Sequence, residues 1–233
     1  MPRNRSEWVI AVDGPSGVGK STISRMLAKR LGFRYIDTGA MYRALAFWAR
    51  YEGISLENPV ELSRLGKELD IVYTETGEGL RILANGKDVT EELRKPGVGE
   101  DASRISRFPE VRRVLVEKQR LLGERGGVVM EGRDIGSVVF PDADLKVFLD
   151  ADVEERVRRR ALQWKAKGIE VPQERLKEEI EARDARDSTR KTAPLKIADG
   201  AVRIDTTRLT KEEVLDKIES CLARIRESSP EAR

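Results

Sequence analysis

The segment from Gly14 to Ser21 carries the residue types and the spacing of a phosphate-binding loop. It reads Gly-Pro-Ser-Gly-Val-Gly-Lys-Ser and matches the pattern G-x-x-x-x-G-K-[ST] in full. Glycines let the chain wrap closely, so that successive backbone N–H groups point at phosphate oxygens. In such loops the lysine, here Lys20, reaches the β- and γ-phosphates, and the hydroxyl of Ser21 can ligate Mg²⁺. The motif predicts a site for ATP, and the residues expected to bind it are Gly14, Pro15, Ser16, Gly17, Val18, Gly19, Lys20, Ser21 and Thr22.

Four further clusters of arginine and acidic residues could bind a second, anionic substrate. They lie at residues 37–43, 102–112, 131–134 and 181–190. The third cluster directly follows an expected strand, and open α/β sheets bind ligands at the carboxyl ends of their strands. Structural roles also fit these residues and stay open at this point. They are an exposed helix position for Arg43, surface charge for Arg112, a helix N-cap for Asp134, and i,i+4 ion pairs within residues 183–187.

The sequence of 233 residues has no histidine and a single cysteine, Cys221. These absences exclude Ser-His-Asp catalysis, Cys-His catalysis and histidine-ligated zinc, and they leave no partner for an intrachain disulfide. Charged residues make up 36% of the chain, but the two signs are interleaved and the net charge is only +3. We therefore expect no polymeric nucleic-acid partner. The single cysteine fits a reducing cytoplasm. No apolar stretch has the length of a transmembrane helix, so we expect no membrane partner, and we expect a monomer.

The phosphate-binding loop alone does not distinguish a kinase from other nucleotide-binding proteins. A GTPase needs the motif N-K-x-D, and the nearest segment, Asn85-Gly-Lys-Asp88, has the wrong order. ATPases of the recombinase or transporter type would usually need a longer chain than this one. The sequence therefore favours a kinase that acts on a small molecule, with a regulatory nucleotide-binding module as an alternative.

Strands and helices alternate around the loop. The β-branched run at residues 8–12 predicts a buried parallel strand, and helical periodicity from Lys20 to a stop at Gly32 predicts a helix. Further strands are expected at 33–36, 127–130, 145–149 and 201–204. Further helices are expected at 40–51, 101–106, 109–123, 152–190 (interrupted near Gly168 and Pro172) and 211–226. This order predicts an α/β fold with a five-stranded parallel sheet flanked by helices.

Residues 70–89 depart from this alternation. They contain short extended pieces at 71–74, 80–83 and 87–89. The pair Asn85-Gly86 between the last two pieces is a strong hairpin signal, because both residues accept a positive φ. The segment predicts a small antiparallel β insertion on the α/β core.

From about residue 7 to residue 225 the chain resembles the bacterial cytidylate (CMP/dCMP) kinases. The motifs that carry the resemblance are Ile10-Ala-Val-Asp-Gly-Pro-Ser-Gly-Val-Gly-Lys-Ser-Thr22, Asp37-Thr-Gly-Ala-Met-Tyr-Arg43, Glu131-Gly-Arg-Asp-Ile-Gly-Ser-Val-Val-Phe-Pro-Asp142 and Arg183-Asp-Ala-Arg-Asp187. The resemblance implies the P-loop fold of nucleoside-monophosphate kinases. Its kinase core would cover 7–69 and 96–227, with a short helical lid at about 155–190 and a β insertion of the NMP-binding region at 70–95.

The implied reaction transfers the γ-phosphoryl group of ATP to CMP or dCMP, with Mg²⁺ as cofactor. ATP and CMP or dCMP are thus the implied small-molecule partners. The acceptor phosphate is already ionised near neutral pH, so the reaction needs no general base, in agreement with the absence of histidine. Other kinases of this fold act on UMP, shikimate or dephospho-coenzyme A, and they remain the alternatives.

The resemblance also implies roles for single residues. Those that match positions reading the cytosine are Thr38, Ser103, Arg112 and Asp134. Arg43, Arg133 and Arg183 match positions at the acceptor phosphate, Asp187 matches one that holds the ribose hydroxyls, and Tyr42 belongs to the same CMP-binding set. Lys20, Arg133, Arg183 and Arg190 are implied as catalytic, Arg158 as an ATP contact in the lid, and Ser21 and Glu131 as metal-binding residues. The resemblance implies an outer-shell role for Glu131 at Mg²⁺. Many relatives carry aspartate here, and the glutamate is one methylene longer, so its contact with the ion would be water-mediated.

Overall fold

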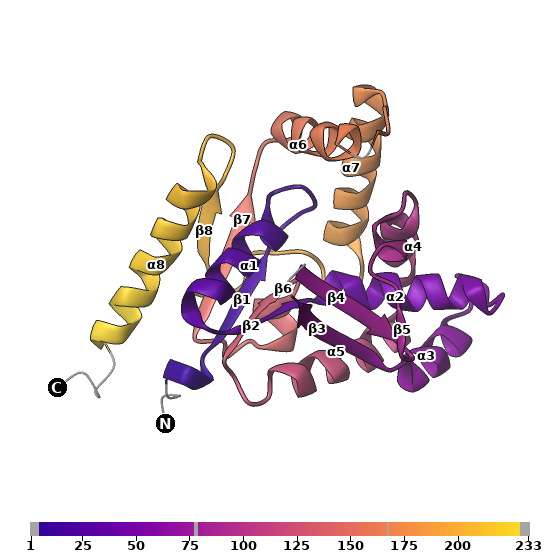
Figure 1. The fold of residues 1–233 in the computed structure, drawn as a ribbon, viewed down its shortest axis with the longest axis horizontal. Helices are drawn as coiled ribbons and strands as arrows, with labels where there is room; N and C mark the ends of the chain where they lie inside the picture. Colours follow the sequence, from indigo (N-terminus) through magenta and orange to yellow (C-terminus); the bar gives the residue numbers. More distant parts are fainter. Residues whose placement is uncertain (1–4, 77–78, 167, 229–233) are drawn as a thin grey trace. The chain divides into compact units, whose positions relative to one another are not determined.

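The computed structural model describes residues 5–76, 79–166 and 168–228. The chain divides into two compact units. The first comprises Met1–Tyr35, Gly123–Thr189 and Ala193–Arg233, and the second comprises Ile36–Leu122 and Arg190–Thr192. Figure 1 shows the strands and helices of each unit.

A parallel sheet forms the centre of the first unit. Its strands are β1 (Val9–Asp13), β6 (Val128–Glu131), β7 (Leu145–Asp150) and β8 (Val202–Asp205), and β2 (Arg34–Asp37) completes the order β2-β6-β1-β7-β8. β1 runs parallel to β6 and to β7, and β7 runs parallel to β8. Every residue of the central strand β1 is buried, as its apolar run predicted. The predicted five-stranded sheet is confirmed.

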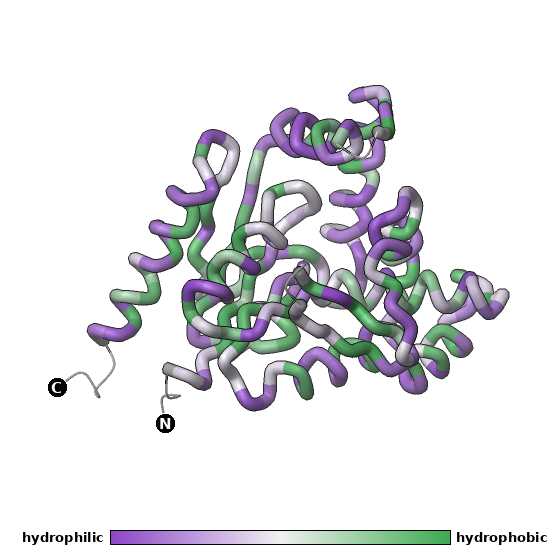
Figure 2. The backbone as a smooth tube through the Cα atoms, in the orientation of Figure 1, coloured by the Kyte–Doolittle hydropathy of each residue, from purple (hydrophilic) through white to green (hydrophobic). Residues whose placement is uncertain are grey.

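The helices of the first unit are α1 (Lys20–Leu31), α6 (Val153–Lys165), α7 (Gln173–Thr189) and α8 (Lys211–Ser228). α1 ends at Gly32, whose φ of 70° and backbone N–H close the last turn as a glycine C-cap does. α8 contacts α1 and β7, and Figure 2 shows apolar and polar residues alternating along it. α6 and α7 pack together around Val157, Trp164, Leu176 and Ile180. The predicted interruption of the long helical region therefore separates two paired helices.

The second unit combines helices with a small antiparallel sheet. Its elements are α2 (Thr38–Tyr51), α3 (Pro59–Glu68), β3 (Ile71–Thr76), β4 (Gly79–Ala84), β5 (Lys87–Asp88), the 3-10 turn η2 (Glu92–Arg94), α4 (Val98–Ile105) and α5 (Pro109–Gly123). The strands pair antiparallel in the order β3-β4-β5. Asn85 and Gly86 between β4 and β5 have φ of 48° and 76°, as a type I′ turn requires. The predicted β insertion is confirmed.

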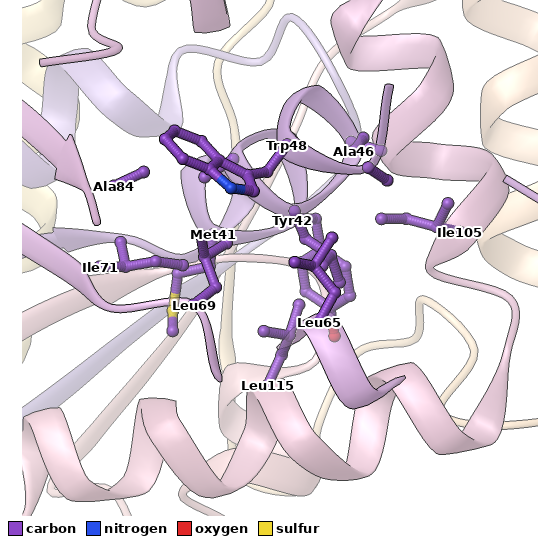
Figure 3. Packing of buried hydrophobic residues seen from close by; sticks show 14 of the residues in the cluster. Met41, Tyr42, Ala46, Trp48, Leu65, Leu69, Ile71, Ala84, Ile105 and Leu115 are labelled. Carbon is purple, nitrogen blue, oxygen red and sulfur yellow. The ribbon is translucent and has the colours of Figure 1, made fainter. Parts of the chain in front are cut away.

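The core of the second unit forms around α2. Figure 3 shows Met41 and Trp48 of α2 packed with Leu69 and Leu115, which come from the end of α3 and from α5. Ile71 and Ala84 bring the small sheet into the same cluster. The β insertion thus shares one core with α2, α3 and α5.

Apart from the short 3-10 turns, two elements were not predicted. One is α3, and the other is a π-helix at Ile135–Val139 (η3) that follows β6. A 3-10 turn at Arg5–Glu7 (η1) precedes β1. Within the described ranges, no helix combines the length and the apolar character that crossing a bilayer requires.

Candidate active site

The phosphate-binding loop starts where β1 ends and finishes at the first turn of α1. Gly14, Gly17 and Gly19 have φ of 145°, 84° and 95°, in the region that favours glycine. A Cβ at Gly14 would lie 2.1 Å from the carbonyl oxygen of Leu149 in β7, so no side chain fits there. Gly19 caps α1 without a side-chain hydrogen bond. The loop therefore joins a positive helix end to a close-fitting backbone turn, which is the arrangement of an anion-binding site.

Lys20 lies inside this loop. Its Nζ donates a hydrogen bond to the carbonyl oxygen of Pro15 at 2.6 Å, and the residue is only 7% exposed. Burial lowers the pKa of the Lys20 ammonium to about 7, and the positive charges of Arg133 and Arg183 contribute to the same effect. A bound triphosphate would favour the protonated form. The positive charges of Lys20, Arg133 and Arg183 therefore repel one another in this site, and a bound anion would relieve that repulsion.

Two side chains fit the binding of Mg²⁺ with ATP. Ser21 is exposed on the first turn of α1, and Glu131 is buried at the end of β6, where it accepts a hydrogen bond from the Tyr35 hydroxyl. In the described part of the chain, no group of three or more acidic, histidine or cysteine side chains could enclose a metal ion. One hydroxyl and one carboxylate suit Mg²⁺, because this ion usually keeps several waters and binds substrate phosphates.

Three residues predicted for the acceptor nucleotide meet in the first unit. Arg133 Nε donates to Asp187 Oδ2 at 2.9 Å, and Arg183 Nε lies 3.8 Å from the same oxygen. Asp187 is buried. The i,i+4 pair along α7 is therefore present, but Arg133 joins it from the turn after β6. Two guanidinium groups around one carboxylate leave a positive charge that suits a phosphate.

Asp134 occupies the N-cap position of η3, with φ of −149°, but its side chain makes no capping hydrogen bond. The cap comes from Asp13 at the end of β1. Asp13 Oδ1 accepts from the Ile135 N–H at 2.8 Å, and Oδ2 accepts from the Gly136 N–H at 2.7 Å. Asp134 was predicted as a possible helix N-cap. Its backbone occupies that position, but its side chain does not cap the helix.

In the second unit, Asp37 organises the start of α2. Its Oδ1 accepts from the Ala40 N–H at 3.1 Å, and its Oδ2 accepts from Arg43 Nη2 at 2.7 Å. The Tyr73 hydroxyl of β3 donates to the Asp37 carbonyl oxygen at 2.7 Å. Thr38 is buried beside this network, and the Arg43 side chain is 25% exposed. The Arg43 side chain is therefore fixed by its ion pair with Asp37, and the alternative of an exposed helix position does not apply.

Ser103, Arg112 and Arg190 gather around Ser106 in the second unit. Ser106 Oγ donates to the Ser103 carbonyl oxygen at 2.8 Å and accepts from Arg190 Nη1 at 3.4 Å. Arg112 Nη1 donates to the Ser106 carbonyl oxygen at 3.3 Å, and its guanidinium carbon lies 5.7 Å from the centre of the Tyr42 ring. Arg112 is 3% exposed, so it is not surface charge. Four predicted residues are thus brought together by this unit.

Two arginines of α6 contact the phosphate-binding loop: Arg159, which belongs to the expected lid segment 158–160, and Arg156, which the sequence did not indicate. Arg156 Nη1 donates to the Ser16 carbonyl oxygen and Arg159 Nη1 to the Val18 carbonyl oxygen, each at 3.3 Å. The predicted Arg158 has a side chain that is 62% exposed and pairs with Glu155. Residues 156 and 159 are three apart and therefore lie on the same face of the helix. This spacing was the one feature of the sequence that could have indicated that both contact the loop.

The family model and the relatives similar in sequence indicate one family. The model of the cytidylate kinase family matches residues 10–224. A cytidylate kinase from Caldanaerobacter subterraneus subsp. tengcongensis is 52% identical over 90% of this chain and 92% of the relative. A cytidylate kinase from Geobacter sulfurreducens is 49% identical over 98% of both chains. The solved structure of a gluconokinase from Sinorhizobium meliloti 1021 covers 96% of both chains at 18% identity, with a TM-score of 0.49.

Proposed function

Because the chain belongs to the cytidylate kinase family, we propose that it transfers the γ-phosphoryl group of ATP to CMP or dCMP, giving ADP and CDP or dCDP. The observation that carries the proposal is the family match over nearly the whole chain. A phosphate-binding loop with a lysine buried inside it supports the ATP half of the reaction. A kinase for UMP or shikimate is not favoured, because the curated relatives at 49–52% identity are cytidylate kinases.

In the proposed reaction the protein aligns two phosphates and offsets their charge. Residues 14–22 bind the phosphates of ATP, and Lys20 donates to the oxygens that gain charge as the phosphoryl group moves. Mg²⁺, held by Ser21 and through water by Glu131, would supply further positive charge there. No side chain has to remove a proton, because the acceptor phosphate is already ionised. Catalysis then depends on positioning and on preorganised charge.

The acceptor roles are proposals residue by residue. In the first unit, Arg133 and Arg183 bind the acceptor phosphate, Asp187 binds the ribose hydroxyls, and Asp134 accepts from the cytosine amine. The arginine–carboxylate cluster and the buried Asp134 support these roles. In the second unit the proposed CMP-binding residues are Thr38, Tyr42, Arg43, Ser103 and Arg112, and Arg190 is proposed as catalytic. The gathering of four of these residues near Ser106 supports the second set.

We propose α6 and α7 as the lid of about residues 155–190, with 7–69 and 96–227 as the kinase core and 70–95 as the insertion. Arg156 and Arg159 extend from α6 to loop carbonyls, which supports a role of α6 at the ATP phosphates. Arg158 is proposed to contact ATP from the same helix. Closure of such a lid would exclude water and suppress ATP hydrolysis. The protein is proposed to be a monomer in the cytoplasm. Sedimentation of the purified protein would test the monomer, and fractionation of cells would test the compartment.

A coupled assay of ADP release tests the function directly. Purified protein with ATP and Mg²⁺ is offered CMP, dCMP, UMP, AMP and shikimate in separate reactions. The expected result is rapid release with CMP or dCMP and slow release with the others. Shikimate or AMP as the best acceptor would refute the proposed function, and ATP binding without any acceptor would indicate a regulatory module.

Replacing Asp134 with alanine tests the base-reading role. We expect the KM for CMP to rise about 10-fold or more with little change in the KM for ATP, because a lost hydrogen bond to a substrate group is worth about 1–3 kcal/mol. Asp142→Ala is the matched control, since Asp142 is an exposed carboxylate of the same sequence motif. Equal changes in both KM values would argue against a contact between Asp134 and the base.

A further inference from the structure

Asp13 is a buried acid that lies next to the phosphate-binding loop but outside its pattern. It is the last residue of β1, so the loop begins at the next residue. Both of its carboxylate oxygens are used, one by the Ile135 N–H at 2.8 Å and the other by the Gly136 N–H at 2.7 Å. One side chain on β1 therefore holds two consecutive N–H groups of the turn that follows β6.

These N–H groups open η3, directly after Arg133 and Asp134. The first N–H groups of a helical segment have no partner within it, and a carboxylate binds such groups more strongly than a neutral oxygen does. Asp13 thus fixes the backbone at the point where the chain leaves the two side chains proposed for the acceptor. A shift of this turn would move Arg133, whose Nε also contacts Asp187.

At Gly136 the turn that follows β6 packs closely against the side chains of Lys146 and Asp13. A Cβ at this position would lie 3.0 Å from Lys146 Cγ and 3.4 Å from Asp13 Oδ2. An added methyl would therefore require the Lys146 side chain to move by a few tenths of an ångström, and it would touch the Asp13 carboxylate.

Burial of this carboxyl group opposes its ionisation. Burial raises the pKa of Asp13 to about 6, although the two N–H groups lower it, and Asp134 raises it while Lys20 lowers it. The pKa lies above the ordinary 3.8, so the carboxyl group ionises less readily in the folded protein than in the unfolded chain. Its ionisation therefore lowers the free energy of unfolding as the pH rises from about 4 to 6. A buried charge that holds two N–H groups beside the proposed acceptor residues points to a functional reason for its presence.

We propose that Asp13 is a positioning residue for the acceptor side of the reaction. It fixes the turn that carries Arg133 and Asp134 to the strand from which the ATP loop starts, so that one residue aligns donor and acceptor groups. The inference rests on the proposed function, because it assigns the turn to CMP. It assigns no contact between Asp13 and either substrate.

The test is Asp13→Asn, which keeps the shape and replaces one acceptor oxygen with an amide donor. One buried N–H then lacks an acceptor, and we expect the KM for CMP to rise on the order of 10- to 100-fold while the KM for ATP changes less than about threefold. Gly136→Ala is the second variant. It keeps the carboxylate but adds a methyl against Asp13 Oδ2 and the Lys146 side chain, so a smaller split of the same sign between the two KM values is expected even if Asp13→Asn does not fold.

Asp144→Asn is the matched control. Asp144 Oδ2 accepts from the Val9 N–H at 2.8 Å at the opposite end of β1, so this variant loses a comparable bond far along the strand from the turn. It is expected to lower the unfolding temperature without changing the ratio of the two KM values. An unchanged KM for CMP in Asp13→Asn and Gly136→Ala, equal rises in both KM values, or the same split in Asp144→Asn would overturn the role of Asp13. Failure of the unaltered protein to phosphorylate CMP would instead overturn the proposed function.

Discussion

Replacing Lys20 with methionine removes the ammonium from the phosphate-binding loop and keeps an unbranched stem of similar length. The Lys20 Nζ lies inside the loop, 2.6 Å from the Pro15 carbonyl oxygen, so in the free protein it is already placed where phosphate oxygens would bind. Loss of one preorganised donor from such a site lowers kcat by about 10²- to 10³-fold. We expect a loss of this size in the coupled assay with ATP and CMP.

The same substitution should not weaken the fold. Burial lowers the pKa of Lys20 from 10.5 to about 7, and this difference means that the folded protein binds the proton less favourably by about 4–5 kcal/mol. Methionine removes that cost and leaves the Pro15 carbonyl without its donor, which costs about 1–3 kcal/mol. The free energy of unfolding at pH 7 is therefore expected to rise, by about 1–4 kcal/mol.

The pH dependence of stability has a definite sign. The folded pKa lies below the unfolded one, so the unfolded chain binds more protons between pH 7 and 10.5. Stability of the unaltered protein therefore rises with pH across this window, and the advantage of the methionine variant is full below pH 7 and smaller at pH 9.

Urea unfolding at pH 6.5 and pH 9 measures this difference alongside the kinetic assay. Lys29→Met is the control, because Lys29 is an exposed lysine of the same helix α1. Near-normal turnover of the Lys20 variant would refute the place of Lys20 in the reaction. A lower free energy of unfolding at pH 6.5 than in the unaltered protein would refute the account of its burial.

Single substitutions at three other positions of the first unit have distinct expected outcomes. Gly14→Ala places a Cβ 2.1 Å from a β7 carbonyl oxygen and should abolish ATP binding in calorimetry; normal affinity would contradict the fit of the loop. Asp187→Ala leaves Arg133 without its carboxylate, so unfolding in urea should become about 3–5 kcal/mol easier, with partial recovery in CMP; no recovery would argue against a phosphate at this cluster. Tyr35→Phe removes the hydroxyl bonded to Glu131 and should raise the Mg²⁺ concentration for half-maximal activity about tenfold; an unchanged Mg²⁺ dependence would contradict a metal role for Glu131.

Much of the fold follows from local patterns of residues. The apolar run of β1, the glycine stop of α1 and the Asn85-Gly86 hairpin each act within a few residues, so a sequence is enough to place them. α3 was missed although it has local signals: the Asn58 side chain accepts from the Glu61 N–H, and Pro59 occupies the first turn. The π-helix η3 is different, because its cap is supplied by Asp13 from a strand far away in sequence.

The candidate site also has a part that follows from local sequence and a part that depends on tertiary packing. The phosphate-binding loop is a continuous segment, so its pattern predicts its geometry. The contacts of Arg156 and Arg159 with loop carbonyls depend on how α6 packs, and no pattern in residues 153–165 distinguishes them from the exposed Arg158 beyond their helical spacing. Contacts across the sheet become visible only when the order of its strands is known.

The π-helix η3 makes the length of the segment 135–139 important for the fold. Its hydrogen-bonded rings are one residue wider than those of an α-helix, as in the bond from the Phe140 N–H to the Ile135 carbonyl oxygen at 2.7 Å. Loss of one codon would convert the segment into an ordinary turn and rotate everything after it by about 100°. Phe140 would then leave its position against Gly123, where a single added methyl would already lie 2.5 Å from the ring. Side-chain exchanges within residues 135–139 are expected to be tolerated except at Gly136, where an added Cβ would lie 3.0 Å from Lys146 Cγ, whereas insertions and deletions there are expected to be eliminated.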